Sequence, residues 1–336
     1  MAYKISNSNV INSDSTAVFA RVIVGVHEGF APPPFMSGST SGYATGGEGS
    51  PSSPYTKSNV IDKFSLASDA NATDVGDLSE ARISATGQSS DANGYTSGGT
   101  TSPPYLNPPS IDIIDKFPFS SDANASDVGN LTQARKDLSG QSSSTHGYSS
   151  GGQTPPSTVH NTIDKFSFSS DGNATDVGDL TQIRLSSAGQ SSPSHGFTSG
   201  GYAPSIPGRT NVIDRFAFAS DANATDYGDT LTAKSNSAGQ SSISNGYSSG
   251  GTNPIMNVIE KFPFASSANA TDVGDLTASK TKPTGQNSSS NGYVSGGNLF
   301  NTKIDVIEKF PFASDANATD VGDLTHVREA LAGQQV

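Results

Sequence analysis

Short stretches of alternating hydrophobic and polar residues run through most of the chain, and one of them returns six times. In the copy at 114–119 (IDKFPF), a two-residue period places Phe117 and Phe119 on one face and Ile114 on the other. Alternation with this period is that of a β-strand. We therefore predict a strand at each copy, and we expect its two aromatic side chains to pack between neighbouring repeat units.

The six copies mark a repeat that has one constant part and one variable part. Each copy leads to a polar segment such as 314–325 (SDANATDVGDLT), then to a Gly-Gln pair such as 87–88, and then to a Gly-Tyr/Phe-x-x-Gly-Gly motif such as 94–99. In the first five units the last glycine of that motif always stands 38 positions after the isoleucine of the copy. The stretch before the next isoleucine varies from 7 to 14 residues, so the variation in length lies in one loop of each unit. The repeated isoleucines are Ile61, Ile114, Ile163, Ile213, Ile259 and Ile307.

A period of 46–53 residues with β-branched and aromatic strand signals and glycine-rich turns is typical of a β-propeller blade. In each unit we predict four short strands, around Gly-Gln, around Gly-Tyr, along Val-Ile-Asp-Lys-Phe and along Asp-Val-Gly-Asp-Leu-Thr. The first unit, which begins at Gly42, lacks the Gly-Gln strand, and we expect residues 331–336 to supply it and close the ring. The predicted fold is all-β, a six-bladed propeller over residues 36–336 with a short N-terminal extension over 1–35.

Composition and charge exclude several kinds of protein. The chain is 32% hydrophobic and 15% charged, below average for both, but its 16 Phe and 10 Tyr recur at fixed places, which favours ordered β structure over disorder. The absence of Cys excludes disulfides, Cys-ligated zinc and Cys nucleophiles. The net charge of −12 argues against nucleic-acid binding. The longest apolar run, 17–26, is too short for membrane insertion and lacks the basic start of a signal peptide.

The polar hairpin of each unit has the spacing of a calcium-binding loop. In 69–77, oxygen-bearing side chains stand at positions 1, 3, 5 and 9, but position 6 is Asp74, where such loops need glycine. Two copies also lose a carboxylate, at Asn130 and at Ser267. We favour a turn in which Asp and Asn cap backbone N–H groups and keep calcium as the alternative, with no other cofactor expected. The calcium candidates are Asp69, Asn71, Asp77, Asp315, Asn317 and Asp323.

The sequence marks no catalytic site. Of the five histidines, only His146 and His195 occupy equivalent positions, and asparagine replaces them in other units. Exchange of His for Asn suits a turn residue better than a metal ligand or a general base. No Ser-His-Asp order and no phosphate-binding glycine loop stands out, and each Ser or Asp is one of several equivalent copies. We therefore predict that the protein is not an enzyme.

The variable loops break the symmetry of the repeat, and loops on a rigid scaffold are common sites of recognition. Proline stiffens several of them, as in 101–109 (TSPPYLNPP), while Tyr, Phe or Met side chains offer contact area. The alternatives are that the loops are solvated connectors or that their side chains pack at the blade rim. The contact candidates are Tyr55, Tyr105, Tyr202, Met256 and Phe300.

The most apolar segment, 18–26, lies outside the repeat. Two roles are open for it: it adds a strand to a neighbouring protein by edge pairing, or it caps the propeller. In the first case the segment docks the protein to a partner. The docking candidates are Val18, Phe19, Val22, Ile23 and Val24.

The order of the motifs resembles the kelch repeat: a Gly-Gly pair, a variable loop, Asn-x-Ile-Asp-x-Phe, a polar hairpin and then an arginine, although the kelch Trp is missing. The strings NVIDKF, SDANATDVGDLT, AGQSS, HGY and SGG resemble repeats in virion proteins of tailed bacteriophages, particularly marine phages of cyanobacteria. Residues 3–13 (YKISNSNVINS) resemble the start of many phage tail-fibre chains. The arginines of the kelch-like layout are Arg82, Arg135, Arg184 and Arg328.

These resemblances imply a structural protein of the virion, located in the tail or adsorption apparatus and present in multiple copies. Its N-terminal segment is then expected to dock to other tail or neck proteins, while the propeller presents its loops to a host-surface glycan or receptor, or to neighbouring subunits. The alternative is a stand-alone, carbohydrate-binding extracellular adhesin or lectin. Multivalent glycan binding by the isolated propeller would favour that alternative.

Overall fold

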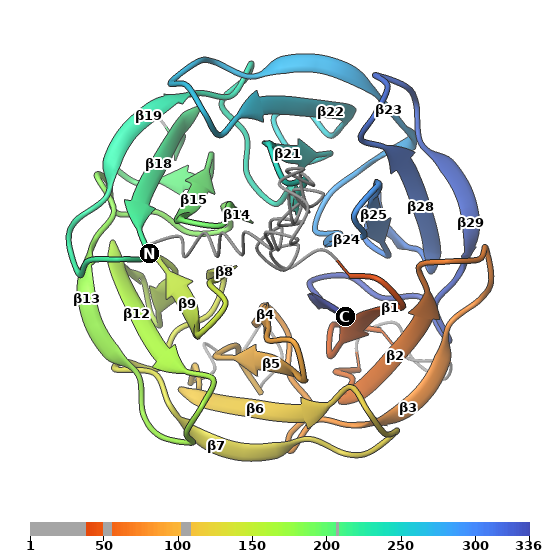
Figure 1. Cartoon of the computed structure of the whole chain (residues 1–336), viewed down its shortest axis with the longest axis horizontal. Coiled ribbons are helices and arrows are strands. Elements are labelled where there is room, and N and C mark those ends of the chain that lie inside the picture. The colour runs from red at the N-terminus through yellow and green to blue at the C-terminus, as the bar shows by residue number, and fades with distance from the viewer. Residues whose placement is uncertain (1–37, 50–55, 102–108, 206–207) are drawn as a thin grey trace, which may run out of the picture. The chain divides into compact units, whose positions relative to one another are not determined.

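The described part of the chain is built of β-strands. The computed structural model describes residues 38–49, 56–101, 109–205 and 208–336. They form six four-stranded antiparallel sheets around a common centre, together with three two-stranded ribbons (Figure 1). The prediction of an all-β, six-bladed propeller is confirmed, whereas the extension 1–35 lies outside the described residues. Within the described ranges no segment is helical, so none is a helix that could span a membrane.

Each four-stranded sheet is one blade, and its strands follow one another from the centre of the ring to the rim. We number the blades 1 to 6 in chain order, with blade 1 containing β1, and give strands below in that order. The innermost strands are β30 (Ala332–Gln335), β4 (Thr86–Ser89), β8 (Ser139–Ser142), β14 (Ala188–Ser191), β20 (Ala238–Ser241) and β24 (Thr284–Asn287). The second strands are β1 (Ser41–Thr45), β5 (Asn93–Ser97), β9 (His146–Ser150), β15 (His195–Ser199), β21 (Asn245–Ser249) and β25 (Asn291–Ser295).

The third strands carry the repeated isoleucine and phenylalanine, and the outermost strands carry the Asp-Val-Gly-Asp motif or its variants. The third strands are β2 (Val60–Ser65), β6 (Ile113–Pro118), β12 (Thr162–Ser167), β18 (Val212–Ala217), β22 (Met256–Pro263) and β28 (Val306–Pro311). The outermost strands are β3 (Thr73–Asp77), β7 (Ser126–Asn130), β13 (Thr175–Asp179), β19 (Thr225–Asp229), β23 (Thr271–Lys280) and β29 (Thr319–Asp323). The ribbons are β10 (Gln153–Thr154) with β11 (Thr158–Val159), β16 (Tyr202–Ala203) with β17 (Gly208–Arg209), and β26 (Asn298–Leu299) with β27 (Thr302–Lys303).

The C-terminal strand closes the ring, as the order of the motifs predicted. Strand β30 pairs antiparallel with β1, in a register that places Thr45 opposite Ala332 and Gly42 opposite Gln335. Blade 1 therefore takes one strand from the C-terminal end of the chain and three from residues 41–77 (Figure 1). Closure of this kind leaves no unpaired blade in the ring.

The aromatic pair that follows the repeated isoleucine packs against the preceding blade in five blades, as the alternating pattern predicted, and in blade 1 Phe64 and Leu66 pack in the same way. Phe117 and Phe119 in blade 2 lie in one buried cluster with Tyr43, Ile61 and Leu78 of blade 1. The ring centroids of Phe117 and Tyr43 are 5.4 Å apart, and the Phe119 ring stacks on Tyr43 at 5.0 Å. Similar aromatic contacts recur between the other blades, so the hydrophobic core is a series of thin layers between blades rather than one thick core.

The innermost strands approach one another at glycine. A Cβ atom at Gly140 would overlap the backbone carbonyl oxygen of Gly87, and the same overlap would arise around the whole ring. This close approach is possible because glycine has no side chain. It explains why a Gly-Gln pair stands in every unit. The ring glycines are Gly87, Gly140, Gly189, Gly239, Gly285 and Gly333.

The glutamine that follows each ring glycine ties its blade to the next. The Nε2 of Gln88 donates to the carbonyl oxygen of Tyr148 at 3.0 Å, and that of Gln334 donates to the carbonyl oxygen of Tyr95 at 2.9 Å across the closure. All six glutamines are buried, and their bonds form a closed circle through the six blades. A buried amide is costly unless it is bonded, so these contacts fix the blades relative to one another.

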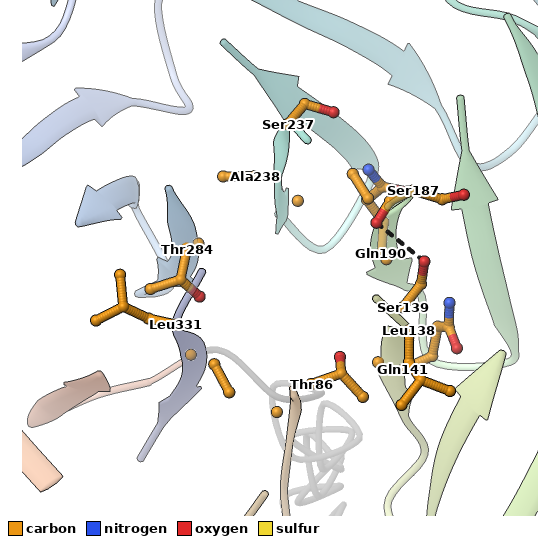
Figure 2. A pocket seen from close by; sticks show the side chains of 18 of the residues that line it. Thr86, Leu138, Ser139, Gln141, Ser187, Gln190, Ser237, Ala238, Thr284 and Leu331 are labelled. Carbon is orange, nitrogen blue, oxygen red and sulfur yellow. Dashed lines mark hydrogen bonds between the residues drawn. The ribbon is translucent and has the colours of Figure 1, made fainter. Parts of the chain in front are cut away.

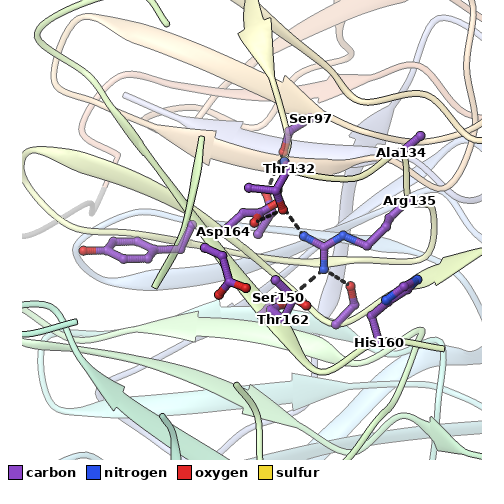
Figure 3. A network of polar contacts seen from close by, with 12 residues as sticks. Ser97, Thr132, Ala134, Arg135, Ser150, His160, Thr162 and Asp164 are labelled. Atoms are coloured by element: carbon purple, nitrogen blue, oxygen red, sulfur yellow. Dashed lines mark hydrogen bonds and ion pairs between the residues drawn. The ribbon is translucent and has the colours of Figure 1, made fainter. Parts of the chain in front are cut away.

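A buried ion pair joins each third strand to the connection that leads into its blade. Nη2 of Arg135 lies 2.6 Å from Oδ2 of Asp164, and both side chains are fully buried (Figure 3). The other nitrogen, Nη1, donates to the carbonyl oxygens of Gly151 and Thr162, while Thr132 donates to the same carboxylate. Nε of Arg135 has no hydrogen-bond partner among the described residues, but the pairing of both Nη atoms and of the carboxylate is what makes the buried charges tolerable. The equivalent pairs are Arg82–Asp115, Arg184–Asp214, Lys234–Glu260, Lys280–Glu308 and Arg328–Asp62.

The ring has two different faces because its strands are antiparallel. One face, here called the loop face, carries the variable loops and the connections between blades, which backbone bridges such as Ile83 to Thr100 join together. The other, here called the turn face, carries the turns after the innermost strands and the outer hairpins. Gly38, where the described chain begins, donates its backbone N–H to the carbonyl oxygen of Asn287 at the turn face. The C-terminal Val336 also lies there, since its carbonyl accepts from Ser39.

Candidate functional site

A polar cavity of about 170 Å³ lies at the centre of the ring. The innermost strands and the residues just before them line it in all six blades, as Figure 2 shows for Thr86, Ser139, Ser187 and Thr284. Ser139 Oγ donates to the carbonyl oxygen of Ser187 at 2.9 Å, so part of the lining is bonded from blade to blade. The lining consists mainly of hydroxyl, amide and backbone groups. Such a cavity suits a small polar ligand.

A circle of six residues, here called the mouth ring, surrounds the cavity on the loop face. Each backbone N–H in the circle donates to the carbonyl oxygen of the member before it, as from Asp137 to Ser84 at 2.8 Å, and the circle closes from Ser84 to Ala330 at 3.0 Å. Each member has a φ between 54° and 58°, although none is glycine. A left-handed conformation costs about 1–2 kcal/mol at most non-glycine residues, and strain of this kind often marks functional positions. The members are Ser84, Asp137, Ser186, Asn236, Lys282 and Ala330.

The side chains of the mouth ring break the symmetry that the rest of the repeat preserves. Asp137 and Lys282 are its two charged members, and they belong to the connections into blades 3 and 6, which lie opposite each other. Oδ2 of Asp137 accepts from Gln153 Nε2 at 3.1 Å, while Nζ of Lys282 lies 3.6 Å from Oε1 of Glu329. Each of the two charged side chains is therefore held by a neighbour, and together they distinguish two opposite sides of the mouth ring.

The predicted contact residues of the variable loops have different surroundings. Tyr202 and Phe300 are 41% and 71% exposed on the loop face. Met256 is only 8% exposed, because β22 begins at this residue and pairs it with Lys280, so little of its side chain is free for a partner. Tyr55 and Tyr105 lie outside the described residues, as do all the N-terminal docking candidates: Val18, Phe19, Val22, Ile23 and Val24.

Four of the six calcium candidates use their side-chain oxygen atoms to bond to a neighbouring blade. Asp69 forms an ion pair with Lys309, and Oδ1 of Asp315 lies 2.6 Å from Nζ of Lys261. Oδ1 of Asn71 accepts the backbone N–H of Asp323 at 3.1 Å. Oδ1 of Asn317 likewise accepts the backbone N–H of Asp275. The backbone carbonyl oxygen of Asp77 accepts the N–H of Ala125 in the next blade. Within the described residues, no three His, Asp or Glu side chains are grouped so as to hold a metal ion.

One interface shows what the first aspartate of the hairpin does. In one hairpin Ser267 replaces this aspartate, and Arg215 replaces the lysine that pairs with the aspartate at the other interfaces. The guanidinium of Arg215 lies over the ring of Tyr227, 4.6 Å from its centroid, and Tyr227 replaces the valine of the other units. Three residues have therefore changed together, and a cation–π contact stands where the other interfaces have an ion pair. This exchange fits a role of the first aspartate in joining blades.

The two equivalent histidines are the first residues of β9 and β15, directly after turns of the turn face. Nδ1 of His146 is 2.8 Å from Oγ1 of Thr145, and Nδ1 of His195 is 2.8 Å from Oγ of Ser194. Burial lowers the pKa of both imidazoles. Each imidazole thus bonds to the residue before it, which is the last residue of the turn.

The mouth ring and the carboxylate partners of the buried ion pairs are not among the sites predicted from the sequence. Two features of the sequence indicate them. The position two residues after each Arg or Lys differs in almost every unit, which marks the mouth ring. Glu replaces Asp at Glu260 and Glu308, and in the same two pairs Lys replaces Arg at Lys234 and Lys280. That joint exchange identifies the two positions as partners.

The fold and this site define a six-bladed β-propeller with a polar central cavity and an asymmetric loop face. No protein-family model matches the chain, and no curated protein matches its sequence. The fold is therefore known from the structure itself, and function has to be inferred from the site.

Proposed function

We propose that the protein is a non-enzymatic structural protein of a tailed-phage virion, part of the tail or adsorption apparatus. In this proposal the N-terminal segment 1–35 docks to other tail or neck proteins, and the loop face is presented to a host-surface receptor or to neighbouring subunits. The virion assignment is supported by the resemblance of the repeat strings and of residues 3–13 to phage proteins.

The observation that carries the proposal is the polarity of the ring. The chain enters the propeller at Gly38 on the turn face, beside Asn287. The variable loops and the mouth ring lie on the opposite face. A segment attached at one face and diverse loops at the other suit a protein that is anchored on one side and displayed on the other.

The rigidity of the ring supports recognition by shape rather than by movement. Glutamine bonds, buried ion pairs and aromatic contacts recur between the blades and hold the loops in fixed relative positions. A preorganised surface loses less entropy on binding than a flexible one. A stand-alone carbohydrate-binding adhesin is the second candidate, favoured by the polar lining of the central cavity.

Deletion of residues 1–35 tests the docking role. We expect the truncated protein to fold with an unchanged melting temperature but to be missing from purified virions, while the full chain is incorporated. A substitution on the loop face, Tyr202→Ala, is the control and should be incorporated normally. Normal incorporation of the truncated protein would contradict the proposal, and glycan binding by a protein that is never found in particles would favour the adhesin.

A further inference from the structure

A second pocket, of about 310 Å³, opens on the loop face beside the mouth ring. Ile255 from the loop of blade 5, Phe300 from the loop of blade 6, and Glu329 from the connection into blade 1 contribute to its lining. Its volume is at the lower end of the range for small-molecule sites. No second blade has this combination of residues among those the structure describes, so the pocket is a feature of one side of the ring.

Phe300 is held at the rim of this pocket in a strained conformation. It stands at the tip of the β26–β27 ribbon with a φ of 47°, and Asn301 follows with a φ of 74°. A two-residue turn of this kind normally takes Asn-Gly, and a bulky residue with positive φ is an outlier. The Phe300 side chain is nevertheless 71% exposed, the highest exposure among the large hydrophobic side chains described. Strain and exposure together indicate a role other than stabilising the fold.

The ribbon that carries Phe300 is fixed to the propeller. Oδ1 of Asn298 accepts the backbone N–H of Asn301 at 2.7 Å. The backbone of Asn298 exchanges two hydrogen bonds with Thr281, at 2.8 and 3.0 Å. The position of the aromatic ring relative to the pocket is therefore set by the connection into blade 6, and little ordering is needed when a ligand binds.

The polar groups of the pocket offer both donors and acceptors. Nζ of Lys282 lies 3.6 Å from Oε1 of Glu329, and the Lys282 side chain is 42% exposed. Thr281 is only 9% exposed, and its Oγ1 has no hydrogen-bond partner among the described residues. The Thr281 hydroxyl is thus covered by the protein, and the accessible polar groups are the Lys282 ammonium, which donates, and the Glu329 carboxylate, which accepts.

We propose that this pocket binds a saccharide, with the sugar ring against Phe300 and its hydroxyl groups bonded to Lys282 and Glu329. A simple anion would be opposed by the carboxylate of Glu329, and a simple cation by the ammonium of Lys282. A sugar hydroxyl donates and accepts, so it satisfies both kinds of group. The C–H face of the ring is apolar and suits the exposed aromatic side chain. This inference deepens the proposed function, since it names the class of receptor that the loop face takes.

The test is a titration of the full chain with glucose, galactose, mannose and N-acetylglucosamine, followed by calorimetry and by saturation-transfer NMR. We expect at least one of these sugars to bind. Phe300→Ala should weaken that binding about tenfold or more, since burying an aromatic side chain contributes on this order. The matched control is Leu231→Ala, which removes a half-exposed hydrophobic side chain from the connection into blade 5 on the loop face and should leave affinity unchanged.

Two results would overturn the inference: none of the four sugars binds, or Phe300→Ala and Leu231→Ala weaken binding equally. The melting temperature of each variant excludes unfolding as the cause. Incorporation into virions is measured separately for Phe300→Ala and should be normal. If no sugar binds but the full chain is incorporated into virions, only this inference is overturned. If the full chain is absent from virions, the proposed function is overturned.

Discussion

Arg328 and Asp62 form a fully buried ion pair across the closure of the ring. Arg328 precedes the C-terminal strand, and Asp62 lies in the third strand of blade 1, so the pair joins the two ends of the propeller. Nη1 of Arg328 also donates to the carbonyl oxygen of Gly46 at 2.9 Å. The contact is equivalent to those between consecutive blades. Closure therefore uses the same bonds as the rest of the ring.

The buried ion pair occurs as Arg–Asp or as Lys–Glu, and this predicts the effect of replacing one or both members of a pair. A long arginine meets a short aspartate in four pairs, and a shorter lysine meets a longer glutamate in two. Arg135→Lys alone should lower the free energy of unfolding by about 1–3 kcal/mol, because Asp164 then loses bonds while remaining buried. Arg135→Lys with Asp164→Glu should recover part of that loss. Urea unfolding of the double-mutant cycle measures the coupling, and additive effects would contradict it.

Substitution of a ring glycine should strain the centre of the propeller. In Gly140→Ala, the added Cβ would overlap the carbonyl oxygen of Gly87, which is backbone and cannot move without shifting a strand. We expect a loss of about 1–3 kcal/mol or more in the free energy of unfolding. Ser144→Ala, in an exposed turn of the same blade, is the control. Equal stability of the two variants would show that the innermost strands are less closely packed than described.

The glutamine circle should contribute to stability at each interface. Gln141→Ala removes a donor to the carbonyl oxygen of Phe197 and leaves the hydroxyls of Ser150 and Thr198 with one partner fewer. Since these groups are buried, we expect a loss of about 1–3 kcal/mol by urea unfolding. Gln133→Ala, at an exposed position of the preceding connection, should change stability little. Similar values for the two variants would argue against a structural role of the circle.

His326 should make the stability of the ring depend on pH. Burial, and then the charge of Arg328, lower the pKa of its imidazole below the ordinary value of 6.5, while Asp62, Asp74 and Asp305 oppose the shift. The unfolded chain therefore binds a proton more readily than the folded protein between pH 6.5 and the lower folded-state pKa. Stability should fall as pH falls through this range, because the unfolded state gains the proton.

His326→Gln removes this contribution and should give a flatter curve of unfolding free energy against pH below 6.5. His146, His160 and His195 are partly buried and have pKa values lowered in the same direction, so the slope should decrease without vanishing. Unfolding in urea at a series of pH values gives both curves. Curves with equal slopes below pH 6.5 would show that the proton affinity of His326 is the same in the folded and unfolded states.

The fold could be predicted from the sequence because the repeat itself contains the blade. The constant spacing from Ile61 to Gly99 defined one unit, and the missing strand before Gly42 required a strand from the C-terminal end. The mouth ring could not be predicted from residue types, because Ser, Lys and Ala carry no signal for a left-handed backbone. It is imposed by the closed circle of backbone bonds. Met256 was chosen as a loop residue, but β22 extends to include it.

The partners in the buried ion pairs were not predicted from the sequence. Arg82 and Asp115 are 33 positions apart, and only the ring brings the connection of one blade to the third strand of the next. The kelch-like layout marks the four arginines in the sequence but gives no indication of their partners. Joint exchange to Lys and Glu in two pairs was the available signal.

Electron cryomicroscopy of the protein in its native assembly tests the central claim most directly, which is that the ring is anchored on its turn-face side and displays its loop face. The account predicts density for a phage tail or neck in which residues 1–35 contact a neighbouring protein, while Phe300 and the mouth ring face solvent. A reconstruction in which the loop face is buried against the particle and the turn face is free would contradict it, as would a free secreted monomer.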